Sequence, residues 1–202
     1  FGLSIMNPFS SVYFDQSIGV KRRLSIKLED IKRIQKDCYK ANDEKRWLIA
    51  LIADTGMRLA EGAGLLKTDF SLEDQILCVT IRPHRWRTLK TKSSARVIPL
   101  IGSAKWAAEQ ILDQTFESKF AFPTYNYKKR TNANSASASL NKWLKERIGQ
   151  TFSIHSFRHS MRDRLREVDC PSEVIDQIGG WARSGVGDSY GEGYSLSKMH
   201  NY

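Results

Sequence analysis

Two histidines and an arginine lie within about one helical turn of each other in the segment His155-Ser156-Phe157-Arg158-His159. Side chains three and four positions apart share a face of a helix, and helix N-termini favour anions. Because a helix is expected to begin here, His155, Arg158 and His159 are candidates to bind one anionic group. A solvated basic face would explain the same residues, and His159 suits a supporting or core position better than a catalytic one.

A second arginine stands at another turn-to-helix junction, in Thr55-Gly56-Met57-Arg58-Leu59-Ala60-Glu61. Arg58 directly follows a helix that is expected to be buried. Glu61 comes one turn later and is placed to orient Arg58 through an ion pair. We therefore expect Arg58 to be held in a fixed direction, either for chemistry or as a structural ion pair.

Two further features complete the set. Lys90 and Lys92 fall in an expected hairpin tip, just before the β-rich run 96–100. Trp181 follows Gly180, and Tyr190 comes nine residues after Trp181 in a glycine-rich stretch. The two lysines are candidate proton donors, and Tyr190 is a candidate oxygen nucleophile.

These residue types suit the attack of an oxygen on a phosphodiester. Negative charge grows on the non-bridging oxygens, and two guanidinium forks that stay protonated stabilise it well. A tyrosine hydroxyl has a pKa near 10, so it needs cations or a base, which His155 and the arginines would supply. A lysine at the tip would protonate the leaving oxygen. A phosphotyrosine bond would conserve the energy of the broken linkage, so ATP is not needed.

No cofactor and no metal are expected, because the two arginines already stabilise the charge. The sequence also lacks a clustered set of carboxylates, which disfavours a two-metal nuclease. Three distant cysteines, at positions 38, 78 and 170, argue against a disulfide framework or a zinc site. They are expected to be reduced, as in a cytosolic protein.

Taken in order, these motifs resemble the catalytic domain of the tyrosine recombinases, the phage-integrase family. That family's signature is an arginine, a hairpin lysine, His-x-x-Arg, a histidine or tryptophan after glycine, and a tyrosine nucleophile at the spacing seen here. In this sequence the signature reads Arg58, Lys90, His155-Ser156-Phe157-Arg158, Trp181 and Tyr190. The resemblance covers residues 25 to about 200 and implies DNA strand cleavage and rejoining through a covalent 3′-phosphotyrosine.

Three positions leave a choice or depart from the family pattern. Position 181 more often holds histidine in the family; Trp181 can donate one N–H but cannot take up a proton. Lys90 matches the Leu-Lys-Thr-Lys-Ser-Ser pattern best, and Lys92 competes with it. Tyr194 lies close to Tyr190, and only the spacing from Trp181 favours the earlier tyrosine.

The elements that position these residues are expected to be mainly helical. Apolar spacing predicts helices, with caps at Ser25 and Ser103, over 25–38, 44–55, 59–66, 104–114, 139–148, 155–168 and 171–178. Strands are expected at 76–81, 87–89 and 96–100, with the tip 90–94 between the last two and a polar loop at 125–137. The fold class is mainly α with a small antiparallel β-sheet, in one catalytic domain over 25–202 after a lead-in at 1–24.

The composition fits a basic, globular domain. The 202 residues carry 32 Lys and Arg against 22 Asp and Glu, a formal charge of +10, and 41% are hydrophobic. This balance argues against disorder and favours a polyanion partner, nucleic acid first and an acidic membrane second. No window approaches the roughly 18 apolar residues that a membrane span needs.

The resemblance implies double-stranded DNA attachment sites, a homotetramer on DNA, DNA-bending accessory proteins, no membrane, and a further DNA-binding domain before residue 1. It also implies a phage or mobile-element origin and action in the bacterial cytoplasm or nucleoid, or in a phage-infected host. Two other functions stay open. A type IB topoisomerase would share the chemistry, although the run 58–61 looks more like integrases. A non-enzymatic DNA-binding module would keep only the basic surface.

Overall fold

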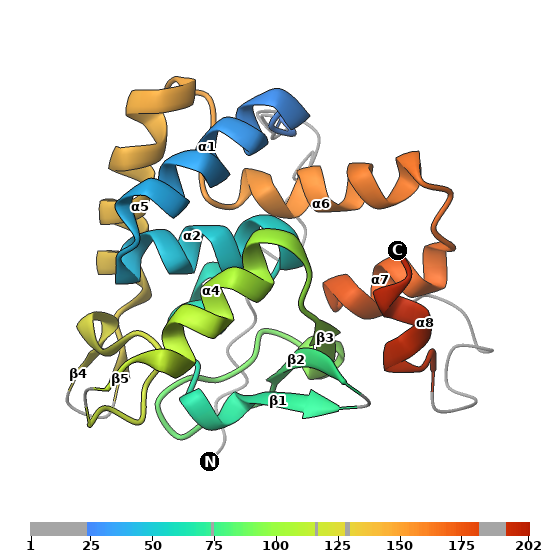
Figure 1. Ribbon diagram of the computed structural model, residues 1–202, viewed down its shortest axis with the longest axis horizontal. Coiled ribbons are helices and arrows are strands. Elements are labelled where there is room, and N and C mark those ends of the chain that lie inside the picture. Colours follow the sequence, from blue (N-terminus) through green and yellow to red (C-terminus); the bar gives the residue numbers. More distant parts are fainter. Residues whose placement is uncertain (1–23, 74, 116, 128–129, 182–192) are drawn as a thin grey trace, which may run out of the picture.

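The computed structural model describes residues 24–73, 75–115, 117–127, 130–181 and 193–202. Helices form most of it, and a small sheet lies along one edge (Figure 1). The helices are α1 (Leu28–Ala41), α2 (Glu44–Thr55), α3 (Leu59–Ala63), α4 (Gly102–Asp113), α5 (Ala133–Ile148), α6 (Ser156–Glu167), α7 (Ser172–Gly179) and α8 (Leu196–His200). This is the expected class, mainly α with antiparallel strands.

Helix α2 is the centre of the core. Every residue from Trp47 to Thr55 is buried, because α2 packs against α1, α4 and α6. Its buried Asp54 accepts hydrogen bonds from Gln35 of α1 (2.9 Å), Ser103 of α4 (2.6 Å) and Arg164 of α6 (2.9 Å). One carboxylate therefore joins all three neighbouring helices to α2, next to the turn that leads to Arg58.

The three-stranded sheet is antiparallel, in the order β1 (Phe70–Glu73), β2 (Ile76–Ile81), β3 (Arg96–Pro99). The predicted strands at 76–81 and 96–100 are confirmed. The predicted strand at 87–89 is wrong, because Arg87 instead forms an isolated bridge with His84 in a tight turn. Apart from short 3₁₀ helices, four elements had not been expected: β1, α8, and the paired strands β4 (Asn126–Tyr127) and β5 (Arg130–Thr131).

The predicted helices are all present, but several ends differ. Helix α1 begins three residues after the expected cap Ser25, whose hydroxyl instead bonds to Asp163 of α6. Ser103 lies inside α4, where its hydroxyl bonds to Asp54. Helix α5 begins at Ala133 within the expected loop, capped by Asn132. Each serine hydroxyl bonds to a residue far away in the sequence, so neither serine caps its helix as predicted.

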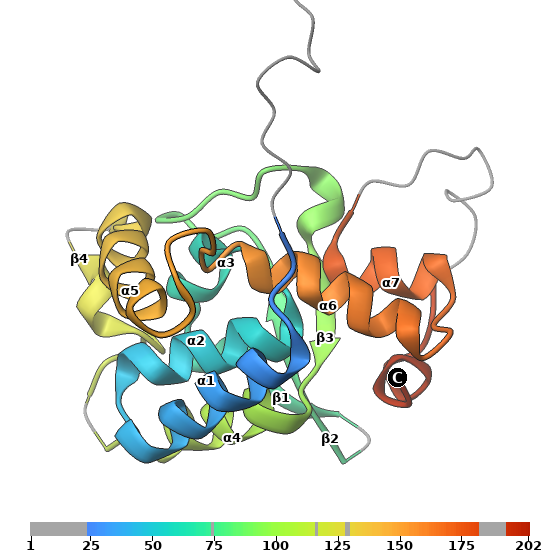
Figure 2. The same ribbon diagram turned by 90° about the horizontal axis from the view of Figure 1, so that it is seen from above.

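The connection from β2 to β3 is irregular rather than a regular hairpin. It spans 82–95 and ends in the 3₁₀ helix η2 (Lys92–Ser94). Two other short 3₁₀ helices are η1 (Lys67–Asp69) and η3 (Pro123–Tyr125). Figure 2 shows the 82–95 connection in green on the side of the molecule away from α1 and α4. This side carries the candidate site.

Candidate active site

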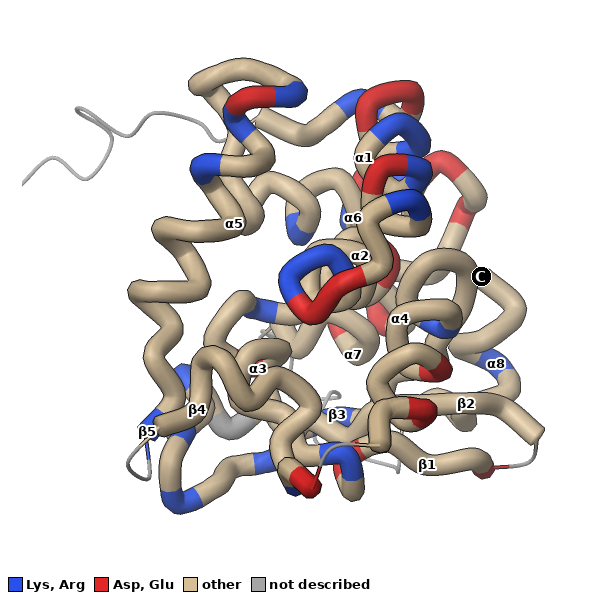
Figure 3. The backbone as a smooth tube through the Cα atoms, turned by 60° about the vertical axis from the view of Figure 1, so that its left-hand side comes forward, with Lys and Arg blue, Asp and Glu red and all other residues tan. Residues whose placement is uncertain are grey.

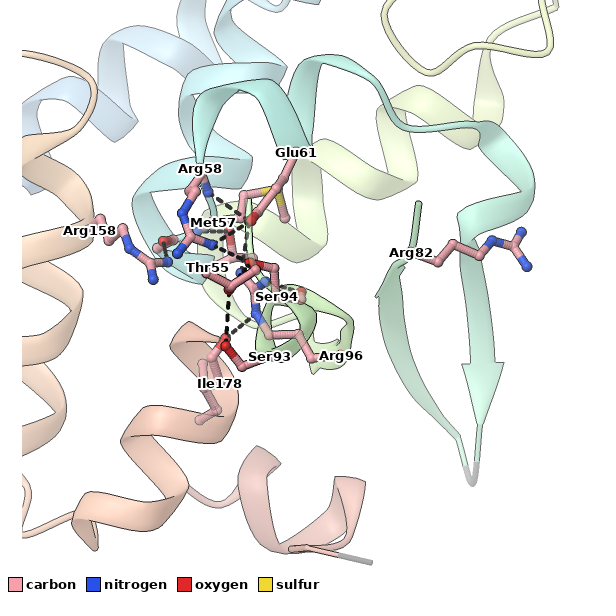
Figure 4. Close-up of polar contacts among 12 residues, drawn as sticks. Thr55, Met57, Arg58, Glu61, Arg82, Ser93, Ser94, Arg96, Arg158 and Ile178 are labelled. Atoms are coloured by element: carbon pink, nitrogen blue, oxygen red, sulfur yellow. Dashed lines mark hydrogen bonds and ion pairs between the residues drawn. The ribbon is translucent and has the colours of Figure 1, made fainter. Parts of the chain in front are cut away.

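Arg58 is fixed by the first turn of α3. Its backbone N–H donates to Glu61 Oε2 (2.9 Å), and its Nη1 donates to Glu61 Oε1 (2.7 Å). The predicted ion pair is therefore present, and the same carboxylate holds the backbone and the side chain. Nη1 also donates to Ser94 Oγ (2.9 Å), which ties the 82–95 connection to Arg58 (Figure 4).

Arg96 is a member of this cluster that the sequence reasoning missed. Its Nη2 donates to Glu61 Oε2 (3.0 Å), its Nε to the Ile178 carbonyl (2.7 Å) and its Nη1 to the Ser94 carbonyl (2.6 Å). The side chain is only 3% exposed. A charged residue at the start of an otherwise apolar strand was the available signal. Arg96 joins β3, α3 and α7 behind Arg58.

Arg158 projects from α6 onto the end of α2. Its Nη1 donates to the Gly56 carbonyl (2.8 Å), and its Nη2 is buried without a hydrogen-bond partner among the described residues. Gly56 has a φ of +61°, and a Cβ there would lie 3.0 Å from the Cβ of Met161. Glycine at position 56 therefore allows both the turn and the close approach of α6.

Positive charge exceeds negative charge in this cluster. Burial alone would raise the pKa of Glu61, but the charge of Arg96 and hydrogen bonds from Arg58 and Arg96 lower it. Burial, together with the charges of Arg58 and Arg96, lowers the pKa of Arg158 to about 10. Arg158 thus keeps its charge at neutral pH, beside the ion pairs that Arg58 and Arg96 form with Glu61. A buried N–H without a partner, in such a field, favours an anion.

Trp181 is positioned by the end of α7. Its backbone N–H donates to the Asp176 carbonyl (3.0 Å), and the backbone N–H of Gly180 donates to the Gln177 carbonyl (3.3 Å). These bonds, with Gly180 at a φ of +61°, form a Schellman motif. A Cβ on Gly179 would lie 1.6 Å from the indole. The Gly-Gly-Trp sequence is therefore needed to fold the indole back over α7.

The indole of Trp181 meets the arginine cluster. The Arg158 Cζ lies over the ring, 4.1 Å from its centroid. His155 precedes α6 as its cap residue, and its ring lies 5.3 Å from that of His159 in an edge-to-face arrangement. The structure thus pairs Arg58 with Glu61 and Arg158 with Trp181, and the charges of Arg58 and Glu61 act on Arg158. The two histidines lie at the same end of α6 as Arg158.

The remaining predicted site residues are described in part. Lys90 is exposed on the 82–95 connection. Lys92 begins the 3₁₀ helix η2, and its side chain lies outside the described part of the chain. The predicted hairpin tip at 90–94 is therefore partly helical. Tyr190 also lies outside the described residues. Tyr194 is described, and its hydroxyl donates to Glu173 Oε2 (3.4 Å).

The described ranges contain neither a metal-binding cluster nor a membrane-spanning helix. These ranges contain no group of three or more His, Cys, Asp or Glu side chains that could hold a metal ion. Nor does any helix there have the length and apolar character to cross a bilayer.

Comparison with known proteins matches residues 25–192 to the Phage integrase family. A curated resolvase of Escherichia coli is 25% identical over 169 residues, which cover 70% of this chain and 64% of the relative. The chain therefore spans less than two thirds of that relative's length.

Solved structures show the same fold. The XerA recombinase has a TM-score of 0.59 at 15% identity, covering 89% of this chain and 61% of that one. The XerH recombinase bound to a palindromic difH substrate has a TM-score of 0.58 at 20% identity, covering 84% of this chain and 49% of that one.

Proposed function

The chain belongs to the phage integrase family, the tyrosine recombinases, and we propose that it cleaves and rejoins double-stranded DNA at specific sites through a covalent 3′-phosphotyrosine. One observation carries this proposal. The buried Nη2 of Arg158 has no partner among the described residues, in a cluster where Arg58 and Arg96 share Glu61. A non-bridging phosphate oxygen supplies the anionic acceptor that this arrangement lacks.

The reaction assigns one role to each residue. Tyr190 Oη attacks the phosphorus and gives its proton to His155, while the bond from phosphorus to the 5′ oxygen breaks. Lys90 gives a proton to the leaving 5′ oxygen, and Arg58 and Arg158 bind the non-bridging oxygens. The indole N–H of Trp181 donates a hydrogen bond to the phosphate. Attack of another 5′ hydroxyl on the phosphotyrosine reverses these steps and joins a new strand.

The position of Tyr194 supports Tyr190 as the nucleophile. The Tyr194 backbone is held to α7 by Gln177, through two hydrogen bonds of 2.8 Å. Its hydroxyl contacts Glu173 rather than an arginine of the cluster. A hydroxyl beside a carboxylate is a poor nucleophile toward a phosphodiester, because the carboxylate repels the substrate's negative charge.

Charge and relatives support DNA as the substrate. Arg82, Arg85 and Lys90 are exposed on the 82–95 connection and Arg130 is exposed on β5; Figure 3 shows Lys and Arg in blue beside β4 and β5, among other places. The similar XerH and Tn1549 transposon integrase structures contain DNA, a difH substrate and a circular intermediate respectively. We further propose a homotetramer on attachment sites, DNA-bending accessory proteins, a preceding DNA-binding domain, a phage or mobile-element origin and action in the bacterial cytoplasm.

The test is covalent capture on DNA. The wild-type protein and its Tyr190→Phe and Tyr194→Phe variants are incubated with supercoiled plasmid and with nicked duplexes of candidate sites, then separated on denaturing gels. We expect an adduct with the wild type and with Tyr194→Phe, and none with Tyr190→Phe. An adduct lost only in Tyr194→Phe would reassign the nucleophile.

Two other outcomes would contradict the proposed function. DNA binding without any adduct would indicate a non-enzymatic binding module. Plasmid relaxation without site preference or strand exchange would indicate a topoisomerase.

A further inference from the structure

Two arginines of α6 share one tryptophan. Arg158 and Arg162 are four residues apart and therefore lie on the same helix face. Their Cζ atoms lie over the Trp181 ring, 4.1 Å and 4.8 Å from its centroid. The family signature uses only the first of them, and the role of the second is open.

We propose that Arg162 is a positioning residue, which holds the Trp181 indole against Arg158 and so fixes the Arg158 guanidinium for the phosphate. This inference rests on the proposed function, because it concerns the geometry of the same site. It gives Arg162 no direct contact with DNA.

The first support is the partner of Arg162. Its Nη2 donates to Asp176 Oδ1 on α7 (3.3 Å), and the backbone carbonyl of the same Asp176 accepts a hydrogen bond from the backbone N–H of Trp181. Asp176 thus holds the arginine through its side chain and the tryptophan through its backbone. Arg162 forms an ion pair with Asp176, whereas Arg158 forms none among the described residues, so Arg162 is better suited to position Trp181 than to bind a phosphate.

The second support is the packing of the indole. Gly179 leaves room for the ring on α7, and α6 covers it with two cations. An aromatic face attracts a guanidinium, so one ring holds both like-charged side chains of α6. Without Arg162, the ring would lose one of its contacts with α6, and Arg158 would lose the fixed surface on which it lies.

The experiment measures cleavage and binding separately. Single-turnover cleavage at saturating DNA and DNA affinity are compared for the wild type, Arg162→Gln and the control Arg166→Gln. Arg166 lies one turn further along α6, exposed, and pairs with Asp163. We expect Arg162→Gln to slow cleavage about tenfold, the scale of one partly buried cation–π contact, with affinity unchanged. The Arg166→Gln variant should match the wild type.

A double-mutant cycle tests whether Arg162 acts through Trp181. In a Trp181→Leu background, Arg162→Gln should cause no further loss of rate. If Trp181→Leu does not fold, the same cycle is run with Asp176→Asn. Full additivity in the cycle that is run, or a wild-type rate for Arg162→Gln, would overturn the proposal. So would a loss confined to DNA affinity, since it would show a direct phosphate contact.

A spectroscopic measurement keeps this inference separate from the proposed function. The indole N–H resonance of Trp181 is assigned by its absence in Trp181→Leu, or in Trp181→Phe if the leucine variant does not fold. It should shift in Arg162→Gln and stay in place in Arg166→Gln. If the wild-type protein forms no DNA adduct but the resonance shifts in Arg162→Gln, the recombinase function is refuted and the contact between Arg162 and Trp181 still stands. An unmoved resonance in an active enzyme would refute the contact alone.

Discussion

Arg158 donates a hydrogen bond of 2.8 Å from Nη1 to the backbone carbonyl of Gly56, a residue 102 positions earlier in the chain. Gly56 stands two residues before Arg58, so a single turn sets both arginines. The turn is itself held in place, because Asp54, two residues before Gly56, joins α2 to three other helices. The relative position of the two guanidiniums is therefore a property of the helical core.

Replacing Gly56 by alanine should damage both the fold and the site. A left-handed residue with a Cβ costs about 1–2 kcal/mol, and the Cβ would crowd Met161 at 3.0 Å. We expect lower stability in urea denaturation and a cleavage rate reduced about tenfold, because α6 must shift with Arg158.

The matched control is Gly149→Ala. Gly149 also has a positive φ (+91°), but a Cβ there would meet nothing within 4 Å. This variant should lose stability while its cleavage rate stays at the wild-type level. Equal cleavage rates in the two variants would show that the packing of Gly56 on α6 does not position Arg158.

The parts that followed from the sequence are those set by neighbours in the chain. The apolar spacing of Leu28, Ile31 and Ile34 repeats locally, so α1 was predictable. The ion pair of Arg58 with Glu61 was predictable for the same reason, since three residues separate them. Strand β1 was missed because its four residues alternate too briefly and depend on pairing with β2, as in Phe70 with Val79.

The parts that could not be predicted depend on distant partners. Arg96 reaches the Ile178 carbonyl across 82 positions, and Ser25 reaches Asp163 across 138. Local rules placed Ser25 at a helix cap and left Arg96 outside the site. Both assignments failed because tertiary contacts determine which hydrogen bonds these side chains make.

Glu61→Gln should remove a pH-dependent part of the stability. The folded pKa of Glu61 lies below the ordinary 4.5, so its carboxylate stabilises the protein above that pH, and the contribution is lost as pH falls through the folded pKa. At neutral pH we expect Glu61→Gln to cost about 3 kcal/mol in urea denaturation, since it leaves buried arginines without their counter-charge.

The difference in free energy of unfolding between the wild type and Glu61→Gln should shrink as the pH is lowered below 4.5. Glu146→Gln, on an exposed residue of α5, should stay within about 0.5 kcal/mol of the wild type. A gap between the wild type and Glu61→Gln that does not change with pH would show that the carboxylate charge is not what stabilises the arginine cluster.

Arg58→Ala and Arg158→Ala should each reduce DNA cleavage about a hundredfold or more, the scale for losing one transition-state donor. DNA affinity should fall far less, because other Lys and Arg contact the phosphates. The control Arg33→Ala removes an exposed arginine of α1 and should leave cleavage unchanged. Thermal unfolding checks that each variant is folded, and a folded variant that cleaves at the wild-type rate would exclude its arginine from the site.

The general acid should be Lys90 rather than Lys92. In an extended strand the two lysines would point to opposite sides, but Lys92 begins the 3₁₀ helix η2, so strand alternation does not separate them. Lys90 is favoured by its match to the hairpin pattern and by its exposed position just before η2, whose Ser94 accepts a hydrogen bond from Arg58.

The lysine that protonates the leaving oxygen becomes dispensable when sulfur replaces that oxygen, because a thiolate leaves without a proton. Lys90→Ala should therefore cleave normal DNA slowly and a 5′-bridging phosphorothioate at nearly the wild-type rate. Lys92→Ala should show only weaker binding, with the salt slope reduced by about one. Sulfur rescue of Lys92→Ala alone would assign the acid to Lys92, and rescue of neither variant would exclude both lysines.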